Sequence, residues 1–160
     1  MLLAVLTVSD RCSRGQMEDT SGPAVVERLR RQFPGSEVEA GLVPDDAESI
    51  AARLEGWCQR SAALVVTTGG TGFGPRDVTP EATLRVIDRA APGLAEAMRA
   101  GTAQINPLAW LSRGVAGLKG STLIVNLPGS RRGAEECLGA ILPLIEHALQ
   151  IAAGGQHHPG

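Results

Sequence analysis

Short runs of apolar, largely β-branched residues recur along the chain and predict the strands of a buried sheet. The runs at residues 2–8, 63–68 and 122–127 are almost continuously apolar, which is typical of parallel strands covered on both faces. A fourth run, at residues 37–43, alternates between polar and apolar positions and fits a strand nearer the sheet edge. We therefore expect four strands, with small or polar residues after each buried one.

Between these runs, hydrophobic residues recur with the spacing of amphipathic helices. Two such helices have apolar faces formed by Val25, Leu29 and Phe33 and by Ile50, Ala51, Leu54, Trp57 and Cys58. Further helices are expected at residues 80–91 and 92–102. The last helix begins near Arg131 and contains Pro143. Proline inside a helix costs about 3 kcal/mol, so we expect a kink or a break there.

The alternation of strands and helices predicts an α/β fold, a three-layer α/β/α sandwich with a mostly parallel central sheet. Doubly wound sheets of this kind bind ligands outside the carboxyl ends of their strands. Ser9 and Asp10 follow the first strand, a glycine-rich loop follows the third, and residues 128–130 follow the last. We expect these three loops to converge on one crevice.

The glycine-rich loop, at residues 69–74, indicates anion binding. Gly69, Gly70, Gly72 and Gly74 leave the backbone N–H groups uncrowded, as in phosphate-binding loops. The loop lacks the Gly-Lys-Ser/Thr ending of a P-loop, and proline stands where the dinucleotide fingerprint needs glycine. A second glycine-containing segment, at residues 117–122, also fails the P-loop pattern and predicts a turn between strands.

The residues after the glycines strengthen the phosphate hypothesis. Arg76 offers a planar fork of donors for phosphate, and Asp77 offers a hard oxygen ligand for Mg²⁺. Thr79 followed by Pro80 predicts a helix N-cap and first helical residue, which places a positive helix end nearby. Asp77 is not needed for that cap.

Composition narrows the classes of partner. The chain has 160 residues, 43% of them apolar, and we expect one domain over residues 1–153 with a disordered tail at 154–160. A formal charge of −2, 2% aromatic residues and no basic stripe argue against nucleic-acid and membrane partners. Cys12, Cys58 and Cys137 are widely spaced, which favours the reducing cytoplasm. The expected partners are small molecules or proteins.

Several short motifs occur in a fixed order. They are TVSDR at residues 7–11 with Gly15, DTSG at 19–22, VPD at 43–45, the glycine-rich segment at 67–80, and LPG at 127–129. This ordered set resembles the molybdopterin adenylyltransferase family, the MogA/MoaB-type proteins of molybdenum cofactor synthesis and their relatives within larger eukaryotic proteins. The resemblance covers nearly the whole chain.

The resemblance implies a reaction in which the terminal phosphate of molybdopterin attacks the α-phosphorus of Mg-ATP. Adenylyl-molybdopterin and pyrophosphate are the implied products, with ATP as co-substrate, Mg²⁺ as the metal and no tightly bound organic cofactor. Asp45 and Asp77 occupy the positions that serve the metal and the reaction. The resemblance also implies a homotrimer, a partner enzyme that inserts molybdate, and a pterin pocket near Ser9, Asp10 and residues 128–130.

Asp45 and Asp77 are thus the candidate catalytic and metal-binding residues. Some candidates also have a purely structural interpretation. Asp45 with Glu48 fits a capping box, Ser9 and Asp10 could close a turn, and Arg76 could be a solvated charge. The candidate substrate- and nucleotide-binding residues are Ser9, Asp10, Thr68, Gly69, Gly70, Thr71, Gly72, Arg76, Pro128, Gly129 and Ser130.

Two other functions stay open at this point. The chain could be a molybdopterin-binding protein that presents the pterin without transferring AMP, or a scaffold domain that serves mainly to assemble a trimer. The presence of both Asp45 and Asp77 favours the enzyme.

Overall fold

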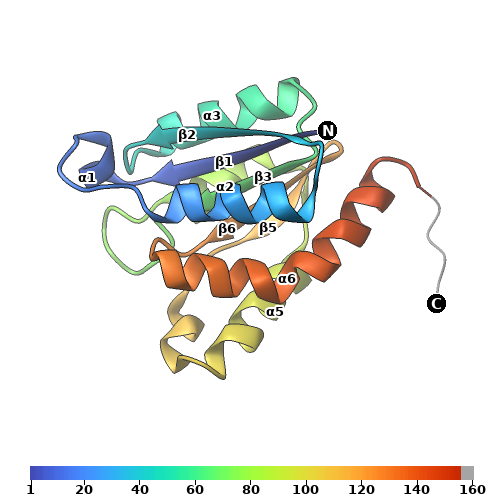
Figure 1. Cartoon of the computed structure of the whole chain (residues 1–160). Helices are drawn as coiled ribbons and strands as arrows, with labels where there is room; N and C mark the ends of the chain where they lie inside the picture. Colours follow the sequence, from blue (N-terminus) through green and yellow to red (C-terminus); the bar gives the residue numbers. More distant parts are fainter. Residues whose placement is uncertain (156–160) are drawn as a thin grey trace.

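A computed structural model describes residues 1–155 and shows one six-stranded sheet with the order β2-β1-β3-β6-β5-β4 (Figure 1). The first four strands in this order are parallel, and β5 and β4 extend the sheet in antiparallel pairing. The strand order reverses between β1 and β3, which creates a topological switch point there. The strands are β1 Leu2–Val8, β2 Glu37–Val43, β3 Leu64–Thr68, β4 Arg89–Ala90, β5 Ala116–Lys119 and β6 Thr122–Leu127.

Helices cover both faces of the sheet, which confirms the predicted three-layer α/β/α sandwich. Alternate residues of β1 serve the two cores, with Leu3 packed beneath α2, α5 and α6 and Leu6 beneath α3 and α4. Figure 1 shows α2 and α6 in front of the sheet. The helices are α1 Asp10–Ser13, α2 Ser21–Gln32, α3 Ala47–Gln59, α4 Thr79–Val86, α5 Pro92–Ala103 and α6 Arg131–Ala152, with a 3₁₀ helix, η1, at Pro107–Leu111.

The expected helix over residues 80–91 is too long, and two strands were not predicted. Helix α4 ends at Val86 because Ile87 turns into an extended conformation with ψ 145°. The following residues pair with β5, where the Asp88 N–H donates to the Leu118 carbonyl at 2.7 Å. Gly120, with φ +57°, forms the turn between β5 and β6, in agreement with the turn expected at residues 117–122.

Helix α6 contains Pro143 within its span, and Figure 1 shows its axis changing direction part-way along. This agrees with the kink expected from the missing proline N–H. The disordered tail expected at 154–160 lies outside the described residues except for Gly154 and Gly155. None of the helices in residues 1–155 combines the length and hydropathy that a membrane span requires.

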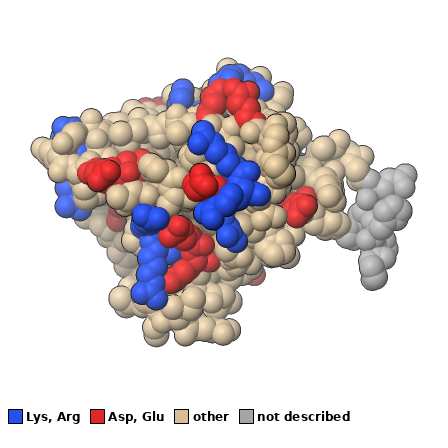
Figure 2. Space-filling view, viewed as in Figure 1, with Lys and Arg blue, Asp and Glu red and all other residues tan. Residues whose placement is uncertain are grey.

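Charges of both signs alternate over α2 and α6 (Figure 2). The pairs Glu27–Arg31, Arg131–Glu135 and Arg132–Glu136 are each one helical turn apart. This face therefore carries no continuous basic stripe of the kind that binds nucleic acid.

Candidate active site

The expected loops meet at the carboxyl ends of β1, β3 and β6, and backbone hydrogen bonds join them. The Ser9 N–H donates to the Val43 carbonyl at 3.0 Å, and the Gly69 N–H donates to the Leu127 carbonyl at 3.1 Å. The loops after β1, β2, β3 and β6 are thereby tied together in pairs. The predicted convergence on one edge of the sheet is confirmed.

Gly69 and Gly70 allow the backbones of these loops to pack against each other. Both have positive φ, +94° and +66°. A Cβ on Gly69 would lie 2.3 Å from the Val8 carbonyl oxygen, and one on Gly70 would lie 2.3 Å from Thr79 Oγ1. Only glycine meets both the conformational and the steric requirement at these positions.

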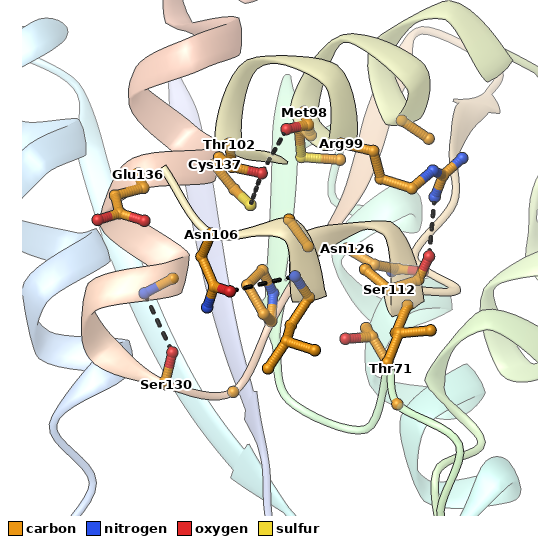
Figure 3. A pocket seen from close by; sticks show the side chains of 18 of the residues that line it. Thr71, Met98, Arg99, Thr102, Asn106, Ser112, Asn126, Ser130, Glu136 and Cys137 are labelled. Atoms are coloured by element: carbon orange, nitrogen blue, oxygen red, sulfur yellow. Dashed lines mark hydrogen bonds between the residues drawn. The ribbon is translucent and has the colours of Figure 1, made fainter. Parts of the chain in front are cut away.

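Two pockets adjoin one another at this edge. A pocket of about 550 Å³, here called the polar pocket, opens between the loops after β1 and β3. A second pocket of about 400 Å³, the apolar-walled pocket, lies between the glycine loop, α5, η1 and the start of α6 (Figure 3). Both volumes fall in the range that binds small molecules. The residues that line both pockets are Gly70, Asp77, Gly129 and Ser130.

Three consecutive backbone N–H groups of the glycine loop have no hydrogen-bond partner among residues 1–155. They belong to Gly70, Thr71 and Gly72, which line the apolar-walled pocket. In contrast, the Gly69 N–H is bonded to Leu127, and the Gly74 N–H donates to Asp77 Oδ2 at 2.8 Å. The loop therefore offers its middle amides, not its flanking ones, to an anion.

Asp45 does not cap α3, so the capping-box interpretation is wrong. The cap is its neighbour Asp46, whose Oδ2 accepts from the Ser49 N–H at 2.8 Å. Asp45 instead turns toward the glycine loop, where its Oδ1 would lie 3.2 Å from a Cβ on Gly70. Partial burial raises the pKa of Asp45, and the charges of Asp10 and Asp77 raise it further.

Asp10 and Arg76, both predicted to contact ligand, contact each other. Arg76 Nε and Nη2 donate to Asp10 Oδ2 and Oδ1, each at 3.0 Å. This bidentate pair holds the pKa of Asp10 below its ordinary value. The pair joins the start of α1 to the segment that follows the glycine loop, beside the polar pocket.

Asp77 stands at the wall shared by the two pockets. Its own N–H donates to the Gly74 carbonyl at 3.0 Å, and its Oδ2 accepts from the Gly74 N–H, so one carboxylate oxygen is used within the loop. A Cβ on Gly72 would lie 2.9 Å from the same Oδ2. Asp77 Oδ1 has no hydrogen-bond partner in the described chain, which leaves it available to a cation.

Thr79 was predicted to be the N-cap of α4, and this prediction is wrong. The helix begins at Thr79 itself and its cap, Val78, makes no side-chain cap bond. Thr79 is fully buried, and its Oγ1 donates to the Gly69 carbonyl at 2.9 Å while its N–H donates to the Gly70 carbonyl at 3.1 Å. Its hydroxyl therefore holds the glycine loop and does not cap the N-terminus of α4.

The predicted hydroxyl residues line the pockets and also hold local structure. Ser9 accepts from the Cys12 N–H at 3.1 Å as the cap of α1, and Ser130 accepts from the Gly133 N–H at 3.0 Å as the cap of α6. Thr68 lies within hydrogen-bonding distance of Ser21 Oγ, at 2.9 Å. The N-terminus of α6, together with Gly129, thus opens at the boundary of the two pockets.

Sequence reasoning missed two residues that support the site. Asn126, buried at the end of β6, donates from Nδ2 to Thr67 and Thr83 hydroxyls at 3.0 Å each. An amide within an otherwise apolar strand was the available signal. Arg113, which follows η1, contacts the glycine loop through several donors. Nothing in its local sequence indicated that contact.

The fold and the site define a doubly wound α/β protein with two adjoining pockets at the carboxyl edge of its sheet. A family model described as a probable molybdopterin binding domain matches residues 4–147. The chain belongs to this family of molybdopterin-binding domains, of the MogA/MoaB type.

Relatives in this family differ in length. The chain is 40% identical over 148 residues to the molybdenum cofactor synthesis protein cinnamon of Drosophila melanogaster, covering 92% of this chain but only 25% of that protein. It is 40% identical over 154 residues to a molybdopterin adenylyltransferase of Helicobacter pylori, covering 95% of this chain and 88% of that protein. A molybdenum cofactor biosynthesis bifunctional protein of Synechococcus elongatus is 37% identical, and the chain covers 48% of its length.

Solved structures support the same assignment. The molybdopterin biosynthesis enzyme MoaB of Thermus thermophilus has a TM-score of 0.87 at 47% identity, with 96% of both chains covered. The Mog protein of Mycobacterium ulcerans has a TM-score of 0.88 at 36% identity, with 94% of this chain and 97% of that chain covered.

Proposed function

We propose that this chain acts in molybdenum cofactor biosynthesis as a molybdopterin adenylyltransferase that uses Mg-ATP. The observation that carries the proposal is the wall shared by two pockets, which contains Gly70 and Asp77. Two separate substrates can occupy adjoining pockets with their phosphates on either side of that wall. A transfer reaction between two phosphorylated molecules needs this arrangement, because proximity and alignment supply much of the rate.

The donor set fits Mg²⁺. Asp45 and Asp77 both line the polar pocket, and each has one carboxylate oxygen without a hydrogen-bond partner among the described residues. No group of at least three His, Cys, Asp or Glu side chains in residues 1–155 could hold a metal ion. Mg²⁺ usually takes one or two carboxylates and completes its shell with substrate phosphates and water. The two aspartates therefore match a metal that arrives with ATP.

The charge of the polar pocket supports a divalent cation as well. A triphosphate in this pocket would face several carboxylates, and the Asp10 carboxylate alone among them has an arginine partner, Arg76. Mg²⁺, when bound, supplies the positive charge that offsets this repulsion. The acidic residues that line the polar pocket are Asp10, Glu18, Asp19, Asp45 and Asp77, and its basic residue is Arg11.

The remaining chemistry requires positioning. A phosphate oxyanion is already an adequate nucleophile at neutral pH, so no general base has to remove a proton. The unpaired N–H groups of Gly70, Thr71 and Gly72 can stabilise charge on a phosphate. The N-terminus of α6 at Ser130 adds a positive dipole end from the other side.

The test is pyrophosphate release from Mg-ATP with and without molybdopterin, followed by mass spectrometry of the pterin product. Pterin-dependent release together with adenylyl-molybdopterin is the expected result. For carboxylate-to-amide variants of Asp45 and Asp77, the matched control is Asp88→Asn. Asp88 forms an exposed ion pair with Lys119, and this variant should retain the activity. Tight pterin binding without product would instead favour the alternative, a molybdopterin-binding protein of the same family.

The proposal extends to partners. The printed name of one relative, a bifunctional protein of molybdenum cofactor biosynthesis, supports a partner domain or enzyme that inserts molybdate. All three cysteines are free thiols, which suits action in a reducing cytoplasm.

We also propose a homotrimer. Trp57 is in the core, but Trp110 is 59% exposed. Leu108 and Leu111 are exposed beside it on η1. These side chains are candidates for subunit contacts, and light scattering should give three times the monomer mass. A stable monomer at micromolar concentration would contradict this part of the proposal.

A further inference from the structure

The glycine loop and the residues that follow it up to Val78, here together called the loop, have little regular structure to hold their shape. Between Thr71 and Val78, the described hydrogen bonds internal to the loop are the two between Gly74 and Asp77. Yet Asp77 must stand within a fraction of an ångström of its working position if it holds a metal against two phosphates. Something outside the loop has to fix it.

Arg113 makes four hydrogen bonds to the loop and to the helix that follows it. Its backbone N–H donates to the Thr71 carbonyl at 2.8 Å, Nε to the Gly72 carbonyl at 2.7 Å, and Nη2 to the Asp77 carbonyl at 2.7 Å. Nη1 forms a short ion pair with Glu81 on α4. One side chain thus joins both ends of the loop and the first turn of α4.

Arg113 is itself held in place. Arg99 Nη1, from α5, donates to the carbonyls of Ser112 at 3.1 Å and Gly114 at 3.0 Å, on either side of Arg113. Figure 3 shows Arg99 directed at Ser112 at the wall of the apolar-walled pocket. Arg99 and Ser112 line that pocket, but Arg113 lines neither of the two main pockets. It therefore acts on the loop and not on a ligand.

We infer that Arg113 is a positioning residue that holds Asp77 at the wall between the two pockets, an inference that rests on the proposed function. The planar guanidinium directs its donors along three separate directions to Gly72, Asp77 and Glu81. A lysine ammonium on a flexible stem cannot reproduce that geometry. Loss of the guanidinium should displace the Asp77 carboxylate and weaken the metal-nucleotide complex.

The experiment measures binding of Mn²⁺ with α,β-methylene-ATP, which cannot be cleaved at the reacting bond, by titration calorimetry. Arg113→Ala should weaken this binding about 10- to 100-fold, the usual effect of removing a residue that orients a metal ligand. Arg113→Lys should be intermediate and should keep the fold if Arg113→Ala does not. Arg85→Ala is the matched control. Arg85, on α4, pairs with Glu48 on α3 and does not contact the loop. It should bind like the unmodified chain.

A double-mutant cycle with Asp77→Ala separates positioning from a general loss of structure. If Arg113 acts through Asp77, Arg113→Ala should change binding by less than about twofold when Asp77 is already absent. An equal loss in both backgrounds, or unchanged binding in Arg113→Ala, would overturn the inference. Hydrogen exchange of amides 70–78 should rise in Arg113→Ala and not in Arg85→Ala.

The outcome stays distinct from that of the proposed function. Failure of the unmodified chain to transfer AMP would refute the transferase, whereas the binding cycle and hydrogen exchange would still decide the role of Arg113.

Discussion

Asp10 and Asp45 exchange reciprocal hydrogen bonds between backbone and carboxylate. The Asp10 N–H donates to Asp45 Oδ2 at 2.9 Å, and the Asp45 N–H donates to Asp10 Oδ1 at 3.0 Å. Arg76 neutralises Asp10 in this pair, whereas Asp45 keeps its second oxygen toward Gly70. Both carboxylates hold the two loops together at the polar pocket, but among the described residues only Asp45 keeps an oxygen without a hydrogen-bond partner.

Asp77→Ala should reduce adenylyl transfer by at least about 100-fold while leaving molybdopterin binding nearly intact, because a metal ligand that stabilises transition-state charge is lost. Asp77→Asn should behave similarly but keep the hydrogen bond from the Gly74 N–H. Steady-state rates and pterin titration distinguish the two properties. An active Asp77→Ala protein would remove the metal assignment.

The raised pKa of Asp45 predicts an acid limb in the activity profile. The ionised carboxylate is the form that binds a cation, so the rate should fall as the pH drops through this raised pKa, at a higher pH than for an ordinary aspartate. A rate profile from pH 4 to 8, roughly the range in which carboxylates titrate, would show this limb. A profile that is flat down to the ordinary aspartate range would contradict it.

Asp45 should also oppose folding at neutral pH. Its folded-state pKa is raised, so the folded state binds the proton more tightly than the unfolded state, and stability is lost as the pH rises through that pKa. Asp45→Asn, which mimics the neutral form and can still accept from Asp10, should therefore raise Tm at pH 7 while removing activity. Asp88→Asn should not raise Tm, because the pKa of Asp88 is lowered by the Gly120 N–H and Lys119.

Gly69 and Gly120 allow strain and steric contact to be separated. Both have positive φ, but a Cβ on Gly120 would meet nothing within 4 Å, whereas one on Gly69 would lie 2.3 Å from the Val8 carbonyl oxygen. Gly120→Ala should cost about 1–2 kcal/mol from the backbone conformation alone. Gly69→Ala should cost at least about 1–3 kcal/mol more, because backbone must move. Urea unfolding of both variants measures the difference.

Glu39 should stabilise the edge of the sheet only above acidic pH. The Arg60 guanidinium and the Trp57 indole N–H lower its pKa to about 2. A lowered carboxyl pKa contributes stability that is present above the unfolded value of 4.5 and lost as the pH falls toward about 2. The stability difference between the unmodified chain and Glu39→Gln should therefore be largest at neutral pH and shrink by pH 3. Denaturant titration at about pH 3 and pH 7 measures this stability difference at both values. An equal difference at the two pH values would contradict the prediction.

The strands with strong patterns were predictable because burial on both faces demands continuous apolar runs, as at residues 2–8 and 122–127. The two-residue strand β4 was not, because Arg89 and Ala90 join the sheet through pairing with β5 and carry no strand pattern of their own. The helix predicted over residues 80–91 was too long for the same reason, because the residues after Val86 carry no strand pattern that would have ended it.

Chemistry and motif order were sufficient to propose Asp45, Asp77 and the glycine loop as candidates, because glycine and carboxylate have distinct physical properties. Their relationships were not predictable. Pairing of Arg76 with Asp10, 66 residues away, and support of Asp77 by Arg113, 36 residues away, depend on which loops meet at the sheet edge.

The sequence by itself determined the α/β alternation and the glycine-rich loop after β3, since these follow from local periodicity and residue chemistry. Tertiary structure alone decided which aspartate is paired, which is partly buried and which stands between the pockets. Burial and charge neighbours are properties of the packed chain, and they set the pKa of Asp45 and the partner of Asp10.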